Sequence, residues 1–329
     1  MNLKGIHFLL TYQCLKECDH CFVWGSPFAE GTFTLNHVKE TLKEAEKLGT
    51  VEWIFFEGGE PFLYYPILVQ ALRQAKQMGF KIGIVTNTYW ATSVEDALEW
   101  LHPIAEVGID DLSFSSDCYH DDRIDNEEAN NAIKAAKQLR LPVGVISIKQ
   151  PEKDAREPNP TRLDGVDVGY SQVMFRGRAA SKLLEKALLK PWSQFTECPE
   201  PLKSPSRVHL DPLGYVHICQ GLCIGNAWKQ PLSEIINSYD PLLHPVVRAL
   251  LQGGPAGLVK EFNLPHEQSY ADACHLCYNA RIQLRPRFPD LLAPSQMYGE
   301  GIETPPTKKE VIINSSTGKL ITPEPKNNP

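Results

Sequence analysis

Near its start the chain carries the stretch Thr11-Tyr-Gln-Cys14-Leu-Lys-Glu-Cys18-Asp-His-Cys21-Phe22, directly after an apolar run. Three cysteines at this spacing supply three thiolates to one metal centre. A 4Fe-4S cluster with three protein ligands keeps one iron open, where an exchangeable molecule can bind and be reduced. Structural zinc takes four ligands, and His20, between two of the cysteines, is the one fourth ligand nearby. The stretch therefore predicts an open 4Fe-4S cluster after the first strand.

Length, charge and cysteine content limit the kind of protein that this is. A chain of 329 residues has room for one large domain and a small one. The formal charge of -7 and the lack of a dense Lys/Arg stripe argue against a nucleic-acid partner. No apolar run approaches the roughly 20 residues of a membrane span, and the start lacks a secretory signal. We therefore expect a cytoplasmic protein without a membrane partner.

The number of cysteines favours metal ligation over disulfides. There are nine, an odd number, and a reducing cytosol keeps thiols free. Seven of them fall into two groups, one at the start of the chain and one in its second half. The remaining two, Cys118 and Cys223, are left over for another role.

Short β-rich runs alternate with amphipathic helical patterns through the first half of the chain. This alternation predicts βα units around a parallel sheet, with ligands at the C-terminal ends of the strands. The stretch from Gln150 to Asp164 has prolines and charges without periodicity, so we expect a loop there. The predicted strands are Ile6 to Thr11, Val51 to Phe56, Lys81 to Thr86, Asp111 to Ser115, Val143 to Ile148 and Val168 to Phe175, and the predicted helices are Leu35 to Leu48, Ile67 to Met78, Val94 to Trp100 and Glu127 to Leu139.

The cysteine loop and a second motif together resemble the radical S-adenosylmethionine (radical SAM) superfamily. The second predicted strand ends in Glu57-Gly58-Gly59-Glu60-Pro61, which is similar to the Gly-Gly-Glu-Pro motif of that family. The resemblance implies an α/β fold with an open, partial (β/α)6 TIM-like barrel. It also implies two cofactors, a 4Fe-4S cluster and S-adenosylmethionine, which is cleaved to a 5'-deoxyadenosyl radical.

The resemblance also points to residues that would contact S-adenosylmethionine. Glycines let backbone carbonyls approach a ligand closely, and a carboxylate or carbonyl there can accept hydrogen bonds from the methionine ammonium. Thr88 stands where relatives often have glycine after Thr-Asn, and a strand-to-helix turn or a helix cap explains several of these residues equally well. The implied cofactor-binding residues are His20, Gly58, Gly59, Glu60, Pro61, Asn87, Ser115, Asp117, Ile146 and Arg178, the last as a partner of the methionine carboxylate.

A second group of cysteines lies in the second half of the chain: Cys198, Cys219, Cys274 and Cys277. Four thiolates suit tetrahedral zinc or a 4Fe-4S cluster, and spacing does not separate the two. The arrangement resembles the twitch domain, a short relative of the SPASM domain, which implies an auxiliary 4Fe-4S cluster. We expect a partial barrel over residues 1–195, a twitch-like domain over 196–290 and an extended or disordered tail over 291–329.

The resemblance is nearest to twitch-bearing peptide epimerases, although their adjacent cysteine pair is missing here. The implied enzyme abstracts hydrogen from a peptide or small metabolite, with flavodoxin or ferredoxin as electron donor. Epimerisation needs a thiol donor, for which Cys223 and Cys118 are candidates, whereas oxidation uses the auxiliary cluster as electron acceptor. Asp211 is a candidate acid or base. The competing hypothesis is a non-catalytic iron-sulfur or zinc protein for electron transfer or assembly.

Overall fold

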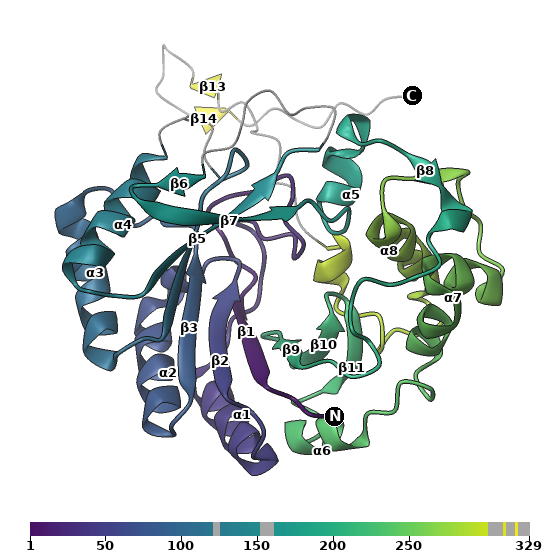
Figure 1. Ribbon diagram of the computed structural model, residues 1–329, viewed down its shortest axis with the longest axis horizontal. Helices are drawn as coiled ribbons and strands as arrows, with labels where there is room; N and C mark the ends of the chain where they lie inside the picture. Colours follow the sequence, from purple (N-terminus) through teal and green to yellow (C-terminus); the bar gives the residue numbers. More distant parts are fainter. Residues whose placement is uncertain (121–125, 152–160, 302–311, 314–319, 322–329) are drawn as a thin grey trace.

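A computed structural model describes residues 1–120, 126–151, 161–301, 312–313 and 320–321, and these form a half-open barrel built on one ten-stranded sheet (Figure 1). The strand order is β11-β10-β9-β1-β2-β3-β4-β5-β7-β6, so the sheet has two free edges and does not close. This confirms the predicted α/β partial barrel. Its parallel strands are β1 (Gly5–Thr11), β2 (Trp53–Gly58), β3 (Lys81–Thr86), β4 (Asp111–Ser115), β5 (Val143–Lys149) and β7 (Val166–Gln172).

Four helices cover the outer side of these strands (Figure 1). They are α1 (Leu35–Leu48), α2 (Tyr65–Gln77), α3 (Val94–Val107) and α4 (Glu127–Gln138). The side chain of Thr34 caps α1 by accepting the His37 N–H, and Gly49 ends it in the left-handed conformation. Helix α3 continues past the predicted end at Trp100 and contains Pro103. Its buried apolar face continues because Leu101 and Ile104 lie on it.

Alternation along the strands decides which side chains face the helices and which face the barrel interior. Phe8 on β1, Phe56 on β2 and Phe114 on β4 are fully buried on the helix side. Successive side chains of a strand point to opposite faces, so Glu57 and Ser115, one position farther along, lie on the concave side. The aromatic side chains of the strands thus pack against the helices, and the polar side chains at the strand ends face the barrel interior.

Residues 207–226 continue this sheet on its β1 edge. Strand β9 (Arg207–Leu210) pairs parallel to β1, and β10 (Tyr215–Cys219) and β11 (Leu222–Asn226) form an antiparallel hairpin beyond it. Gly214 makes the turn at φ 88°, and Asp211 Oδ1 accepts the N–H groups of the residues on either side of it. The hairpin that carries Cys219 is therefore attached directly to the strand that precedes the cysteine loop.

Three helices follow the hairpin and lie beside it (Figure 1): α6 (Leu232–Ser238), α7 (Pro245–Phe262) and α8 (Ala273–Leu284). Apolar spacing in the sequence did not predict α7 or α8. Helix α7 is broken at Gly253 and Gly254, which interrupts its periodicity, and α8 buries side chains on several sides. No helix within the described ranges is both long and apolar enough to cross a bilayer.

Part of the loop predicted before the last barrel strand is a strand in the structure. Arg162–Leu163, expected in a loop, forms β6 and pairs antiparallel with β7, while residues 152–160 of that loop lie outside the described residues. The remaining short elements are η1 (Pro61–Tyr64), α5 (Ala179–Lys182), η2 (Leu184–Lys186), β8 (Lys190–Pro191), η3 (Trp192–Gln194), β12 (Ser269–Tyr270), η4 (Ser295–Tyr298), β13 (Ile312–Ile313) and β14 (Leu320–Ile321).

The beginning of the predicted C-terminal tail is packed into the core. Leu292, Met297 and Tyr298 are each at most 5% exposed, because the chain from residue 291 lies against α8 and the hairpin. The Tyr298 hydroxyl donates to the Gly221 carbonyl, and its ring stacks on Tyr278. The predicted tail therefore starts too early, and its later residues fall mostly outside the described ranges.

Replacing Tyr298 tests this packing. We expect Tyr298→Ala to lower the free energy of unfolding by about 3–5 kcal/mol, because it removes a buried ring. Tyr298→Phe keeps the ring and loses one hydrogen bond, so we expect about 1 kcal/mol. Urea unfolding measures both variants. Equal stability of the alanine variant and the original chain would show that residues 291–299 do not belong to the core.

Candidate active site

A cavity of about 290 Å³ lies at the C-terminal ends of the barrel strands. The cysteine loop walls one side and the ends of β2, β3, β4, β5 and β7 wall the other. Ten of the residues predicted from sequence line it: Cys14, Cys18, His20, Cys21, Gly58, Gly59, Asn87, Ser115, Asp117 and Ile146. The fold thus brings the metal-ligand candidates and most cofactor-binding candidates into one space.

The close approach of β2 to the cysteine loop depends on Gly58 and Gly59. The Gly59 N–H donates to the Thr11 carbonyl at 2.7 Å, and the next N–H donates to the Gln13 carbonyl at 2.9 Å. A Cβ on Gly59 would lie 2.1 Å from the Gln13 oxygen, and one on Gly58 would lie 2.5 Å from the Thr11 oxygen. No other residue type fits there without moving the loop, so the motif fixes the loop against the strand.

Arg178 holds the other side of the loop. Its guanidinium donates to the Cys18 carbonyl and to the Gly25 carbonyl, each at 2.8 Å, and its backbone N–H donates to the Cys21 carbonyl at 2.9 Å. The side chain is buried and does not line the cavity. Its predicted role as partner of the methionine carboxylate stays a prediction, and in this structure two guanidinium nitrogens donate to backbone carbonyls of the loop.

Glu60 and Pro61 also stand behind the cavity wall. The buried Glu60 carboxylate accepts the Asn87 N–H at 2.7 Å, the Thr86 hydroxyl at 2.8 Å and the Phe62 N–H at 3.0 Å. Burial raises the pKa of this carboxyl to about 7 in spite of these donors. Pro61 begins η1. The cofactor-binding role predicted for Glu60 stays a prediction, and in this structure its carboxylate ties the end of β2 to the end of β3.

Asp117 is a buried negative charge in the wall of the cavity. Its Oδ2 accepts the Ile148 N–H at 3.1 Å, and its Oδ1 lies 2.8 Å from His120 Nδ1. Burial alone would raise the pKa of Asp117, but the hydrogen bond and charge of His120 outweigh burial and lower it to about 2. Burial lowers the pKa of His20 to about 4, so this ring is neutral near pH 7. The wall therefore pairs an ionised carboxylate with a neutral imidazole.

The cysteine thiols fit the ligands of a metal cluster. The Lys16 N–H points at Cys14 Sγ at 3.4 Å and the Gly25 N–H at Cys21 Sγ at 3.2 Å, which is the backbone hydrogen bonding that thiolate sulfur accepts. Burial raises the pKa of Cys14 to about 12. Three such thiols become thiolates together when a metal supplies positive charge. The donor set therefore suits a 4Fe-4S cluster bound by three cysteines.

The second set of cysteines gathers between the hairpin and α8. Burial raises the pKa of Cys198 to about 12, and the charges of Cys277 and Cys219 add to this increase. Arg176 Nη1 lies 3.2 Å from Cys219 Sγ. Arg281, which is 1% exposed, donates to the carbonyl of the residue after Cys219. Two buried guanidinium groups beside these thiols suit an anionic four-thiolate centre, which also includes Cys274 of α8.

Cys223 and Asp211 belong to one buried polar network. Cys223 Sγ lies 3.3 Å from His217 Nδ1 and donates to the Ala293 carbonyl at 3.1 Å. His217 Nε2 lies 3.1 Å from Asp211 Oδ2, which also accepts the Tyr12 hydroxyl at 2.6 Å. Cys223 and Asp211 are both fully buried and are not among the cavity-lining residues. Their predicted catalytic roles stay predictions.

Cys118 lies elsewhere, past the end of β4. It is exposed, and the Gln150 side-chain amide donates to its sulfur at 3.1 Å. The thiol is one residue from Asp117 but does not line the cavity. A donor role for Cys118 therefore needs a substrate that extends to the mouth of the barrel.

Several cavity residues were not predicted. Lys16, between two cysteines, donates from Nζ to the His120 carbonyl at 2.6 Å, and Ser171 at the end of β7 completes the wall. Glu57 lies within the quoted motif but was given no role. Its position on the concave face of β2 follows from strand alternation, which is the signal that was available.

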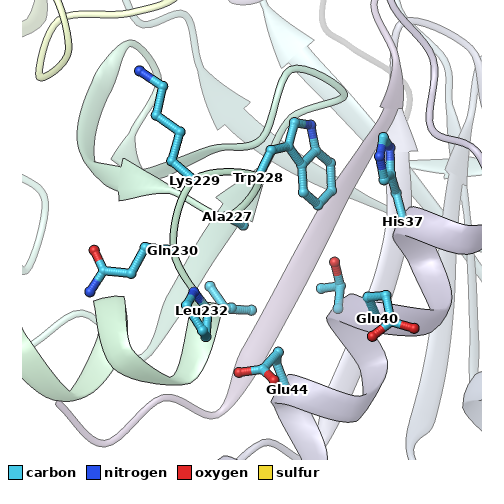
Figure 2. A pocket seen from close by; sticks show the side chains of 10 residues that line it. His37, Glu40, Glu44, Ala227, Trp228, Lys229, Gln230 and Leu232 are labelled. Carbon is cyan, nitrogen blue, oxygen red and sulfur yellow. The ribbon is translucent and has the colours of Figure 1, made fainter.

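A larger cavity of about 420 Å³ opens between α1 and the segment that enters α6 (Figure 2). The His37 ring stacks on Trp228 there, with ring centroids 4.1 Å apart. The Ser233 hydroxyl, at the start of α6, donates to Glu44 of α1 at 2.5 Å. No predicted site residue lines this cavity, so its size does not make it the active site.

Comparison with known proteins agrees with the chemistry of the first cavity. Residues 8–156 match the family model described as the radical SAM superfamily. The chain is 26% identical over 198 residues to the putative peptide biosynthesis protein YydG of Bacillus subtilis. It is 33% identical over 116 residues to the tungsten-containing aldehyde ferredoxin oxidoreductase cofactor-modifying protein of Pyrococcus furiosus. These matches cover 59% and 35% of this chain, but 62% and 31% of the two relatives.

Solved structures give similar matches at low sequence identity. One is BtrN in complex with AdoMet and 2-DOIA, at 17% identity and a TM-score of 0.45, covering 74% of this chain and 87% of that one. Another is Streptococcus suis SuiB bound to precursor peptide SuiA, at 13% identity and a TM-score of 0.47, covering 83% and 76%.

Substituting Gly59 tests the contact that fixes the loop. We expect Gly59→Ala to displace the Gln13 carbonyl and expose Cys14, because the new Cβ has no space. If the substitution destabilises the closed form of the loop by about 1.4 kcal/mol, the rate of thiol labelling at Cys14 rises about tenfold. Mass spectrometry of the cluster-free protein measures this rate. Gly253→Ala is the control, since its Cβ meets nothing within 4 Å. Unchanged labelling in Gly59→Ala would contradict the role given to this glycine.

Proposed function

Because this chain belongs to the radical SAM superfamily, we propose that it cleaves S-adenosylmethionine reductively and abstracts a hydrogen atom from a substrate C–H bond. When bound, a three-thiolate 4Fe-4S cluster and S-adenosylmethionine together supply a 5'-deoxyadenosyl radical. The observation that carries the proposal is the single cavity shared by Cys14, Cys18, Cys21 and the polar ends of the parallel strands.

Residues of this cavity have chemistry that suits the cofactor. The Gly58-Gly59 backbone lines the wall without side chains, so carbonyls there can accept from an ammonium group. Asp117 is ionised and can accept from hydroxyl or ammonium donors. Ile146 is 40% exposed and gives an apolar surface for a nucleobase. His20 adds a neutral ring beside the cysteines.

We infer that the substrate is oxidised. Gln220 follows Cys219 where the similar epimerases have a second cysteine, and the Cys223 thiol is fully buried with its sulfur hydrogen-bonded. Arg178 contacts the first cysteine loop while Arg176 contacts Cys219, so one short segment joins the two thiol sites. In this reaction the hydrogen atom leaves in 5'-deoxyadenosine, one electron passes to an auxiliary 4Fe-4S cluster, and a proton passes to a base.

A peptide is the preferred substrate class. The support is the similarity to YydG, whose printed name is a putative peptide biosynthesis protein. A small metabolite is the alternative, and flavodoxin or ferredoxin is the proposed electron donor. Epimerisation is the second candidate reaction, because the Cys223 thiol is connected through His217 to Asp211, which can restore its proton.

Cysteine variants test the assignment of the two sites. After anaerobic reconstitution we expect about eight irons per chain, and about four in Cys14→Ala and in Cys274→Ala, because each variant loses one cluster. Dithionite-reduced Cys14→Ala should form no 5'-deoxyadenosine, whereas Cys274→Ala should still form it. The measurements are iron content and chromatography of the nucleoside. Equal nucleoside formation by Cys14→Ala would end the proposal.

Solvent labelling separates oxidation from epimerisation. In D2O with a peptide substrate, oxidation predicts a product lighter by two hydrogens and without deuterium at the reacting carbon. Cys223→Ala should then form the same product at a similar rate, with Cys118→Ala as the matched variant. Deuterium incorporation that disappears in Cys223→Ala, with 5'-deoxyadenosine still formed, would establish epimerisation instead.

A further inference from the structure

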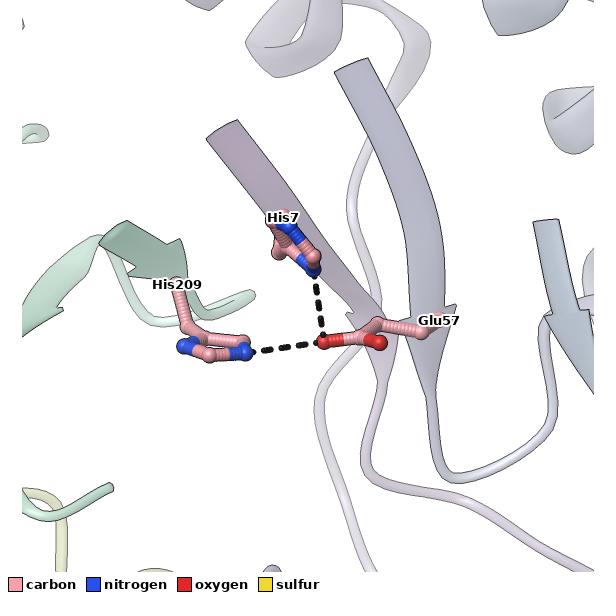
Figure 3. A group of neighbouring side chains, drawn as sticks. All are labelled: His7, Glu57 and His209. Carbon is pink, nitrogen blue, oxygen red and sulfur yellow. Dashed lines mark ion pairs between the residues drawn. The ribbon is translucent and has the colours of Figure 1, made fainter. Parts of the chain in front are cut away.

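Two histidines and a glutamate converge on the concave face of the sheet (Figure 3). His7 comes from β1, Glu57 from β2 and His209 from β9, three strands that lie next to one another. His7 is paired directly with His209, and Glu57 lies two positions beyond the partner of His7 on β2. Parallel register with period-two alternation therefore directs all three side chains to the same side.

The donor atoms have the spacing of ligands around one ion. Glu57 Oε1 lies 3.4 Å from His7 Nδ1 and 3.0 Å from His209 Nε2. All three donor atoms lie within 4.8 Å of one another. Adjacent ligands at metal bonds of about 2.1 Å are about 3.0–3.4 Å apart. The Glu57 oxygen is thus already at ligand distance from each imidazole nitrogen.

Buried polar atoms without hydrogen bonds point into this space. His7 Nδ1 and Glu57 Oε1 are both buried, and neither has a hydrogen-bond partner among the described residues. The side chains of His7, Glu57 and His209 are 17%, 16% and 10% exposed. A buried polar atom without a partner costs free energy. A cation bound by His7, Glu57 and His209 together removes this cost.

The surrounding residues fix the rings in place. His7 stacks on Phe55 with ring centroids 4.7 Å apart, and its ring lies 5.0 Å from that of His209. Both rings stand on strands whose backbones are paired in the sheet. The ion pairs that Glu57 makes within the described part of the chain are those with the two histidines.

We propose that His7, Glu57 and His209 bind a divalent first-row transition-metal ion, iron(II) by preference, separate from the two cysteine sites. Two imidazoles and one carboxylate on one side of an ion form the ligand set of non-haem iron(II) centres, which leave positions open. Glu57 also lines the cavity at the strand ends, so the proposed ion lies at the border of the space assigned to the substrate. An oxygen ligand of the substrate, such as a carboxylate or a carbonyl, fits these positions.

The test uses the full chain with its thiol sites filled. Protein is reconstituted anaerobically with natural-abundance iron, desalted, given one equivalent of 57Fe(II), and desalted again. Mössbauer spectroscopy then detects the added iron and separates a high-spin ferrous site with nitrogen and oxygen ligands from iron in clusters. We expect about one such ferrous ion per chain, and at least about tenfold less in Glu57→Gln and in His209→Ala.

His102→Ala is the matched control, because it removes an exposed histidine that also faces a glutamate, at 3.5 Å. It should retain the ferrous ion like the original chain. Glu57→Gln nearly preserves side-chain shape, so it keeps the test valid if a histidine variant fails to fold. No retained high-spin iron in the original chain, or equal retention in all variants, would overturn the proposal and leave Glu57 as an ion-pair partner of the two histidines.

Discussion

The cysteine loop is held in place because two glycines at the end of β2 let one backbone lie directly on another. Gly59 donates to the Thr11 carbonyl, and a Cβ at this position would lie 2.1 Å from the Gln13 oxygen. The same turn ends in Glu60, whose buried carboxylate binds the end of β3. Three neighbouring strand ends are thereby fixed to one another, and the thiols have a defined position relative to the cavity.

A second constraint joins the barrel to the C-terminal helices. Gly177 adopts φ 60°, and a Cβ there would lie 2.5 Å from the Cys21 carbonyl. Arg178 beside it binds carbonyls of the first loop, whereas Arg176 points to Cys219. Because β9 pairs with β1, the hairpin that carries Cys219 moves with the barrel rather than apart from it. The two thiol sites are therefore parts of one rigid arrangement.

The sequence predicted those features that local patterns determine. Strands and helices of the barrel follow from apolar alternation, and the cysteine loop and Gly58-Gly59 turn follow from short motifs. The contacts of Glu60 with the end of β3 and of Arg178 with the cysteine loop were not predicted, because the sequence does not tell which polar groups their side chains reach. His7 and His209 are 202 positions apart in the sequence. They meet because β9 pairs with β1, and no local sequence pattern predicts this pairing.

The most direct test of an open, three-thiolate cluster is electron paramagnetic resonance of the reduced Cys274→Ala, Cys277→Ala double variant. This protein keeps the first cysteine site and lacks two ligands of the second, so one cluster dominates the spectrum. Adding S-adenosylmethionine should change the g-values, because the ligand binds the iron that lacks a cysteine. A reduced cluster whose spectrum is the same with and without S-adenosylmethionine would contradict the proposed chemistry of the barrel.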